Sequence, residues 1–155
     1  MIHGRPRLTE DVDVTLDLDE VSAATLVAKL ATVSFELAEF ADEEFVGATR
    51  VLPFVHNATG MSLDVVLAGP GLEQLFLAEA EEVDLGGVRV PVIRVEHLLV
   101  TKILAARPKD LDDAREILQS RDDIDRDLVR GLLRDLEIAL DQSDLVTLFD
   151  DLAGG

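Results

Sequence analysis

Residues 11–19 read DVDVTLDLD, and their strict alternation of polar and apolar side chains decides the fold more than any other stretch. The odd-numbered positions hold aspartate or threonine, and the even-numbered positions hold valine or leucine. A period of two residues is typical of a β-strand that buries one face and exposes the other. The stretch therefore predicts a strand that carries a row of carboxylates on one face.

The segments that follow this strand predict an α+β fold. Apolar spacing predicts helices and β-rich runs predict two hairpins, one of them closed by Gly86-Gly87. In chain order, the expected elements are helices over 20–41 and 42–49, a hairpin over 51–57 and 61–69, a helix over 72–80, a hairpin over 81–95, and helices over 96–106, 109–120, 125–138 and 142–152. Pro53 suggests that the strand over 51–57 lies at a sheet edge or begins late. We expect an α+β fold with a mixed β-sheet flanked by helices and a helical C-terminal half. Residues 1–155 would form a single domain, with a sheet part over about 1–95 and a helical part over about 96–155.

Composition narrows the class of protein. The chain of 155 residues has no cysteine, which excludes disulfides and thiolate metal sites. It holds no apolar run of the roughly 18 residues that span a membrane, and its first residues have no apolar signal core. We therefore expect a cytoplasmic protein that has no membrane partner.

The net charge of −18 repels nucleic acid over most of the surface, so binding of RNA or DNA stays an open question. One window reverses this charge. Between Arg89 and Lys109 the chain carries five basic residues and a single acid, Glu96. A local excess of positive charge in an acidic chain indicates a site for bound phosphate.

Three carboxylates are candidate metal ligands. Asp11 and Asp13 lie on the same face of the predicted strand, with Cα atoms about 6–7 Å apart. Asp64 is an isolated acid in the apolar run SLDVVLA, where a lone charge needs a partner. Mg²⁺ binds one or two carboxylates together with substrate phosphates, so these residues suit a metal–nucleotide complex. The alternative is an amphipathic strand with a solvated acidic face.

Three segments together resemble a known family: HGRPRLTEDVDVTL over 3–16, MSLDVVLA over 61–68, and VEHLLVTKILAARPKDLDD over 95–113. They are similar to nucleotidyltransferases of the DNA-polymerase-β-like superfamily, in the branch that contains AbiEii-type toxins and related small domains. The resemblance implies transfer of a nucleoside monophosphate from an NTP to an RNA, protein or small-molecule acceptor, within a toxin–antitoxin system.

The resemblance also implies roles for individual residues. Asp11 and Asp13 would bind Mg²⁺ or Mn²⁺ carrying the triphosphate, and Asp64 would be the third carboxylate, acting as a base toward the acceptor hydroxyl. Four further residues would bind the nucleotide phosphates or orient the cations that do so. These are Lys102, Arg107, Lys109 and Asp110, of which Lys102 would reach the triphosphate and Asp110 would orient a basic side chain.

One family feature is missing from the chain. A Gly-Gly or Gly-Ser turn normally precedes the D-x-D pair by roughly ten residues, and here Met1 stands ten residues before Asp11. Either the chain starts late relative to the gene product, or this member has lost the turn. The alternative function is therefore a non-catalytic, degenerate module that acts through a protein partner or as a homo-oligomer.

The three histidines are too far apart in sequence to indicate a zinc site. Glu96 and His97 stand where a helix should begin. We expect Glu96 to cap that helix and His97 to be partly exposed. His56 is expected on an edge strand.

Overall fold

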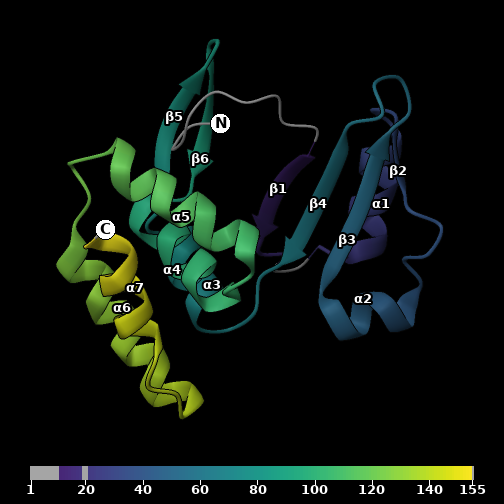
Figure 1. Ribbon diagram of the computed structural model, residues 1–155. Helices are drawn as coiled ribbons and strands as arrows, with labels where there is room; N and C mark the ends of the chain where they lie inside the picture. Colours follow the sequence, from purple (N-terminus) through teal and green to yellow (C-terminus); the bar gives the residue numbers. More distant parts are fainter. Residues whose placement is uncertain (1–10, 19–20, 155) are drawn as a thin grey trace. The chain divides into compact units, whose positions relative to one another are not determined.

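A computed structural model describes residues 11–18 and 21–154 (Figure 1). The chain divides into two compact units, and the division falls between Ala78 and Glu79. The segment before Asp11 in the resemblance, and the positions Asp19 and Glu20, lie outside the described residues. The mixed sheet and the helical C-terminal half confirm the predicted α+β class.

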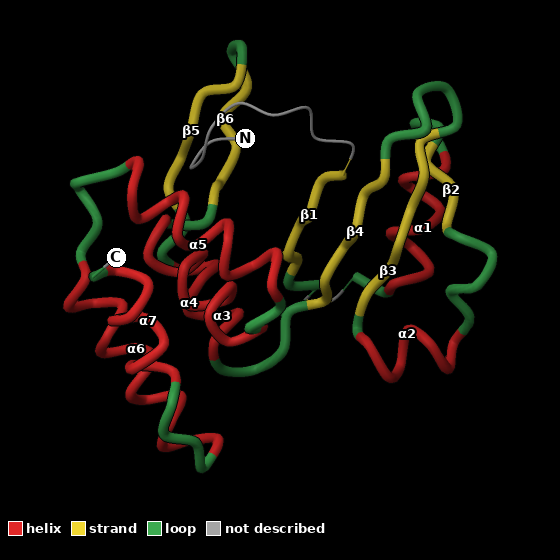
Figure 2. The backbone as a smooth tube through the Cα atoms, viewed as in Figure 1, coloured by secondary structure: helices red, strands yellow, loops and turns green. Residues whose placement is uncertain are grey.

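The first unit is built on a four-stranded sheet with the order β1-β4-β3-β2. Its strands are β1 (Asp11–Leu16), β2 (Phe35–Leu37), β3 (Val51–His56) and β4 (Ser62–Leu67). Strand β1 runs parallel to β4, whereas β3 runs antiparallel to both of its neighbours. Its helices are α1 (Ala23–Ala31), α2 (Glu43–Thr49) and α3 (Leu72–Ala78). The predicted hairpin over 51–69 is therefore present as β3 and β4 (Figure 2).

The two faces of this sheet differ in chemistry. Leu52, Phe54 and Val65 are buried on one face and form a core with the apolar side of α1. The alternation along each strand sends the neighbouring side chains, Asp64 among them, to the opposite face. The apolar period in DVDVTL thus directs Leu16 to the core and leaves the aspartates on the other side.

The helix expected over 20–41 is wrong over its second half. Helix α1 begins after Ser22, whose hydroxyl accepts a hydrogen bond from the Thr25 backbone N–H at 3.2 Å, and it ends at Ala31. Ser34 then adopts a left-handed conformation with φ 67°, which turns the chain into β2. Because a segment of three residues is too short to show a period, only pairing with β3 identifies Phe35–Leu37 as a strand.

Strand β3 is not at the edge of the sheet, so the expectation from Pro53 is wrong, and with it the placement of His56 on an edge strand. Proline is tolerated here because the ladder with β2 ends at Phe54, one residue after it. The carbonyl of Pro53 accepts a hydrogen bond from Ala38 N–H at 2.9 Å, and Ala38 directly follows the end of β2. The proline nitrogen, which has no hydrogen to donate, therefore faces a position beyond the end of β2.

The second unit combines a separate hairpin with four helices. Its elements are β5 (Glu81–Leu85), β6 (Val88–Val92), α4 (Val95–Ala105), α5 (Pro108–Ser120), α6 (Arg126–Leu140) and α7 (Leu145–Ala153). These match the predicted segments. Gly86 and Gly87 have φ values of 68° and 92°, as a two-residue hairpin turn requires. In Figure 2 the four helices lie together, and the hairpin extends away from them.

Helix α4 is the centre of the helical group and packs against α5, α6 and α7. Leu99, Val100 and Ile103 have no measurable exposure, and neither has His97. A helix surrounded by other elements buries more than one stripe of its surface, which is why α4 has apolar residues on several sides. No helix in residues 11–18 and 21–154 is long and apolar enough to cross a membrane.

The burial of α4 predicts the effect of removing one of its side chains. Ile103→Ala should lower the free energy of unfolding by about 2–5 kcal/mol, because it deletes fully buried methyl and methylene groups and leaves a cavity. Ile138→Ala in α6 is the matched control, since Ile138 is 81% exposed and its loss should change stability by less than about 0.5 kcal/mol. Urea denaturation followed by circular dichroism measures both. Equal effects of the two substitutions would contradict the placement of α4 at the centre.

Candidate metal and phosphate site

The parallel pairing of β1 with β4 places two carboxylates side by side. Asp13 is the direct partner of Asp64 in the strand register, and Asp11 is the partner of Ser62. Neighbouring strands lie about 4.8 Å apart, and residues in register point to the same face. Asp11, Asp13 and Asp64 therefore share the face of the sheet opposite the apolar core, as the sequence-based assignment requires.

The three aspartates differ in exposure. Asp11 and Asp13 are exposed, whereas Asp64 is half-buried between Leu63 and the buried Val65. Across β4 from β1, Asp64 lies opposite Pro53 on β3. Asp64 is thus the carboxylate at the inner, more apolar end of the group, while Asp11 lies nearest the start of the described chain.

These carboxylates fit a divalent metal as a partial site. Among the described residues, no three Asp, Glu, His or Cys side chains come close enough together to hold an ion by themselves. Mg²⁺ does not need such a set, because it takes one or two protein carboxylates and completes its shell with phosphate oxygens and water. Adjacent, hard oxygen ligands on Asp13 and Asp64 meet that requirement. The assignment of Asp11 as a further ligand stays a prediction.

The cations predicted to bind phosphate lie in the second unit, and acidic side chains hold two of them. The Lys102 Nζ atom on α4 lies 2.8 Å from Asp113 Oδ2 and 3.6 Å from Asp110 Oδ1, both on α5. The Arg107 guanidinium forms a two-point contact with the Asp110 carboxylate through its Nε and Nη2 atoms. Asp110 and Asp113 are buried, while the Arg107 side chain is 76% exposed.

Asp110 therefore contacts both Arg107 and Lys102, while its role in a phosphate site stays a prediction. The hydrogen bond from Arg107 lowers the pKa of Asp110 below its usual value, and the positive charge of Arg107 and Lys102 adds to this effect. Burial opposes the shift, because it disfavours the charged carboxylate. Asp110 is thus ionised at neutral pH and fixes Lys102 and Arg107 beside the first turn of α5. Asp113 was not singled out from the sequence, because only the packing of α5 on α4 brings it to Lys102.

The basic window between Arg89 and Lys109 is divided into separate parts. Lys102 and Arg107 share Asp110, and Lys109 follows in the first turn of α5. Arg94 instead pairs with Glu79, Glu81 and Glu96 at 3.2–3.7 Å. The Lys102–Lys109 part of the window is therefore the candidate phosphate site, and Arg94 does not belong to it.

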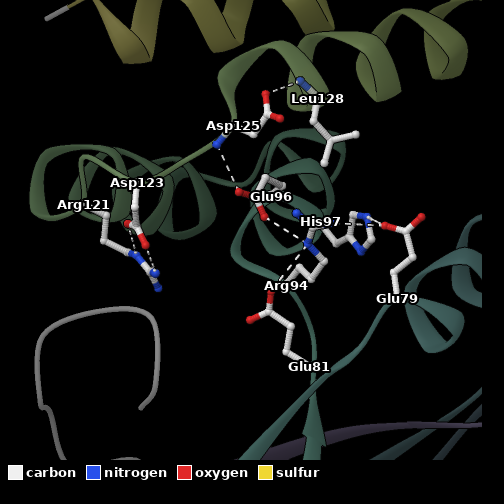
Figure 3. A network of polar contacts seen from close by, with 9 residues as sticks. All are labelled: Glu79, Glu81, Arg94, Glu96, His97, Arg121, Asp123, Asp125 and Leu128. Atoms are coloured by element: carbon white, nitrogen blue, oxygen red, sulfur yellow. Dashed lines mark hydrogen bonds and ion pairs between the residues drawn. The ribbon is translucent and has the colours of Figure 1, made fainter.

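Figure 3 shows the network around Arg94, which contains two buried groups, Glu96 and His97. Glu96 does not cap its own helix. Its Oε1 atom accepts a hydrogen bond from the backbone N–H of Asp125, 3.1 Å away at the start of α6. His97, expected to be partly exposed, is fully buried, with Nε2 3.6 Å from Glu79 Oε2. Both expectations are wrong because helix periodicity in α4 cannot show that the start of α6 and Glu79 approach its first turn.

Burial lowers the pKa of His97 below its usual value, because a buried imidazolium loses its hydration. The nearby Glu79 carboxylate opposes this shift, and the Arg94 guanidinium adds to it. The imidazole is therefore neutral at neutral pH. Because its folded pKa is depressed, protonation of His97 favours the unfolded state as the pH falls below about 6.5.

The lowered pKa of Asp110 predicts how the stability of the second unit changes with pH. A carboxylate with a lowered folded pKa stabilises the native state above its unfolded pKa of about 3.9, and this contribution is lost as pH falls through the folded pKa. Asp110→Asn should therefore lower the free energy of unfolding by roughly 1–2 kcal/mol between pH 5 and 8.

The difference from the wild-type protein should shrink steadily below about pH 4. Urea unfolding across this range measures it, with Asp135→Asn as the control, because Asp135 is an exposed carboxylate of α6. A stability difference that stayed constant down to pH 2 would show that ionised Asp110 contributes nothing specific.

Comparison with known proteins adds one finding about family. Residues 70–146 match a domain family described as a nucleotidyl transferase of unknown function (DUF2204). No protein in a curated collection matches the chain. The matched residues include Lys102, Arg107, Lys109 and Asp110 but not Asp11, Asp13 or Asp64. The match covers just under half of the chain and supports a nucleotidyltransferase-like domain of unknown function.

Proposed function

We propose that the protein is a metal-dependent nucleotidyltransferase that transfers a nucleoside monophosphate from an NTP to an acceptor hydroxyl. The observation that carries the proposal is the register of β1 and β4, which sets Asp13 directly beside Asp64 on the polar face of the sheet. The family match supports the same class of reaction from the other half of the chain. An amphipathic strand with a solvated acidic face would not require the half-buried Asp64 beside Asp13.

In this reaction the acceptor oxygen attacks the α-phosphorus, and the bond to the β-phosphate oxygen breaks to release pyrophosphate. A divalent ion, Mg²⁺ or Mn²⁺, would neutralise the phosphate oxygens when bound. Asp11, Asp13 and Asp64 would hold the metal–triphosphate complex by their carboxylate oxygens. Asp64 would take the proton of the acceptor hydroxyl, a role that suits a carboxylate whose neighbours are apolar.

The cations of the second unit form a separate part of the proposal. Lys102 and Arg107 are held in place by buried carboxylates and would bind phosphate oxygens, with Lys109 adding positive charge. Helix α5 starts at Pro108, and its free backbone N–H groups favour an anion at the same end. The acceptor would be an RNA, a protein or a small molecule, and a role in an AbiEii-like toxin–antitoxin pair is part of the proposal.

Loss of either adjacent carboxylate should weaken binding of the metal–nucleotide complex. Calorimetric titration of Mg²⁺–NTP should give a dissociation constant at least tenfold higher for Asp13→Asn and for Asp64→Asn than for the wild-type protein, because each change removes a charged ligand. Glu39→Gln removes an equal charge from an exposed turn of the same unit and should leave the affinity unchanged. Wild-type protein that binds no NTP in the presence of Mg²⁺ would instead favour the non-catalytic partner-binding module.

The phosphate role of Lys102 needs a variant that keeps its surroundings folded. Removing Lys102 alone would strand the buried Asp113 carboxylate, so the test is the double variant Lys102→Met, Asp113→Asn. Its NTP affinity should fall by about 1.5–3 kcal/mol, the usual contribution of a charge-assisted contact. The single variant Asp113→Asn keeps the cation and should bind nearly as well as the wild-type protein. Equal affinities of the double variant and the wild-type protein would remove Lys102 from the site.

A further inference from the structure

The hairpin of β5 and β6 has an open edge that none of the reaction chemistry uses. Within the described residues these two strands form a sheet of their own, and β5 pairs with no strand other than β6. A two-stranded hairpin leaves backbone N–H and C=O groups unpaired along both outer edges, and such an edge accepts a further strand. We propose that the outer edge of β5 binds an extended, basic segment of a partner protein as a third strand.

The register of the hairpin shows which backbone groups are available. Leu85 pairs with Val88 across the two-residue Gly86-Gly87 turn, and such a turn is closed by a hydrogen-bonded pair. Hydrogen-bonded and non-hydrogen-bonded pairs alternate along antiparallel strands. The pairs Asp84–Arg89 and Glu82–Pro91 are therefore non-hydrogen-bonded pairs, and the backbone groups of these residues point away from the other strand of the hairpin.

This alternation makes the two edges unequal. On β6 one of the two outward positions is Pro91, which has no N–H to donate. On β5 both outward positions, Glu82 and Asp84, keep their donor and their acceptor. The edge of β5 can therefore form a complete ladder with an added strand, whereas the edge of β6 cannot.

The side chains of β5 define the sequence of the segment that would fit. Val83 and Leu85 lie on one face of the hairpin. Leu85 is 50% exposed, and its pairing partner Val88 is 62% exposed. Glu82 and Asp84 lie on the other face and are exposed. A partner strand would place apolar side chains beside Val83 and Leu85, and Lys or Arg beside Glu82 and Asp84. Strand β6 itself carries this pattern, with Arg89 between Val88 and Val90 on the opposite side of β5.

Charge favours a basic partner protein over a second copy of this chain. Two β5 edges placed together would bring Glu81, Glu82 and Asp84 of each copy close to the same residues of the other, and like charges on adjacent strands repel. An added strand that alternates valine with lysine removes this repulsion and buries the exposed tip of the hairpin. The surface lies outside the proposed catalytic groups, so its test is independent of theirs.

The probe is a fluorescein-labelled peptide in which valine alternates with lysine, and its length of about eight residues lies within the usual range for a strand. Fluorescence anisotropy at about 0.15 M salt, where exposed charges more than about 8 Å apart are largely screened, measures its affinity for the full chain. A peptide of the same composition in scrambled order is the control for unspecific attraction to an acidic protein. Amide NMR shifts of the ¹⁵N-labelled protein locate the contact.

Two proline variants compare the edges directly. Glu82→Pro removes an outward N–H from β5 and should weaken binding of the alternating peptide at least tenfold. Arg89→Pro makes the equivalent change at an outward position of β6 and should not weaken binding. Glu82→Lys keeps the backbone donor and reverses the charge, so it should also weaken binding severalfold, even if proline disturbs the hairpin. In the wild-type protein, the largest amide shifts should fall on Glu82 and Asp84.

Four results would overturn the proposal. Equal binding of the scrambled peptide would mean that charge alone attracts it, and equal binding to Glu82→Pro, Glu82→Lys and the wild-type protein would exclude the β5 edge. A dimer that Glu82→Pro dissociates, seen by sedimentation, would assign the edge to a second copy. Peptide binding that occurs only after deletion of residues 1–10, which carry Arg5 and Arg7, would assign it to the chain itself.

Discussion

The parallel ladder between β1 and β4 is the constraint on which the first unit depends. Among the described strands of this sheet it is the one parallel pairing. Parallel strands cannot be joined by a tight turn, and the chain passes through α1, β2, α2 and β3 between β1 and β4. The same ladder fixes the register at which Asp13 meets Asp64. A slip of one residue would turn Leu16 away from the core and the aspartates into it, so burial of the apolar face enforces the alignment of the carboxylates.

The second unit uses a different principle, in which one buried helix organises charged groups around it. Lys102 on α4 forms ion pairs with Asp110 and Asp113 on α5. Glu96 on α4 accepts a hydrogen bond from the backbone N–H of Asp125, directly before α6. Each contact joins α4 to a different neighbour, so the ion pairs and hydrogen bonds also specify how the helices are arranged. Buried charges of this kind stabilise little by themselves, but removing one partner leaves the other without compensation.

The sequence predicted elements with strong local signals and failed where tertiary contacts decided the outcome. The alternation in DVDVTL, the Gly86-Gly87 turn and the four C-terminal helices depend on spacing within one segment, and all are present. The helix predicted over 20–41 is wrong at Phe35–Leu37, because three residues carry no period of their own and the pairing with β3 is visible only in the fold. The exposure of His97 failed for the same reason, since periodicity identifies one apolar face and not the helices that cover the others.

The positions of the candidate carboxylates could be predicted from the sequence, whereas the contacts of the basic residues could not. The resemblance and the lone charge of Asp64 led to the adjacent carboxylates, because their alignment follows from a two-residue period on both strands. The role of Asp113 beside Lys102 and the engagement of Arg94 by three glutamates were not predictable, because charge counting along a chain does not show which acid approaches which base.

Ala106, with φ 50° and its N–H donating to Lys102 C=O at 3.0 Å, has a consequence for folding. This left-handed residue ends α4, and Arg107 follows directly as the residue before α5. Lys102 and Asp110 therefore meet across a very short connection, and closing it costs little chain entropy. Asp13 and Asp64 meet only after most of the first unit has been placed between them. The cationic cluster thus rests on contacts between residues that are close in sequence, while the Asp13–Asp64 pair joins residues far apart in sequence and carries the larger loop-closure cost.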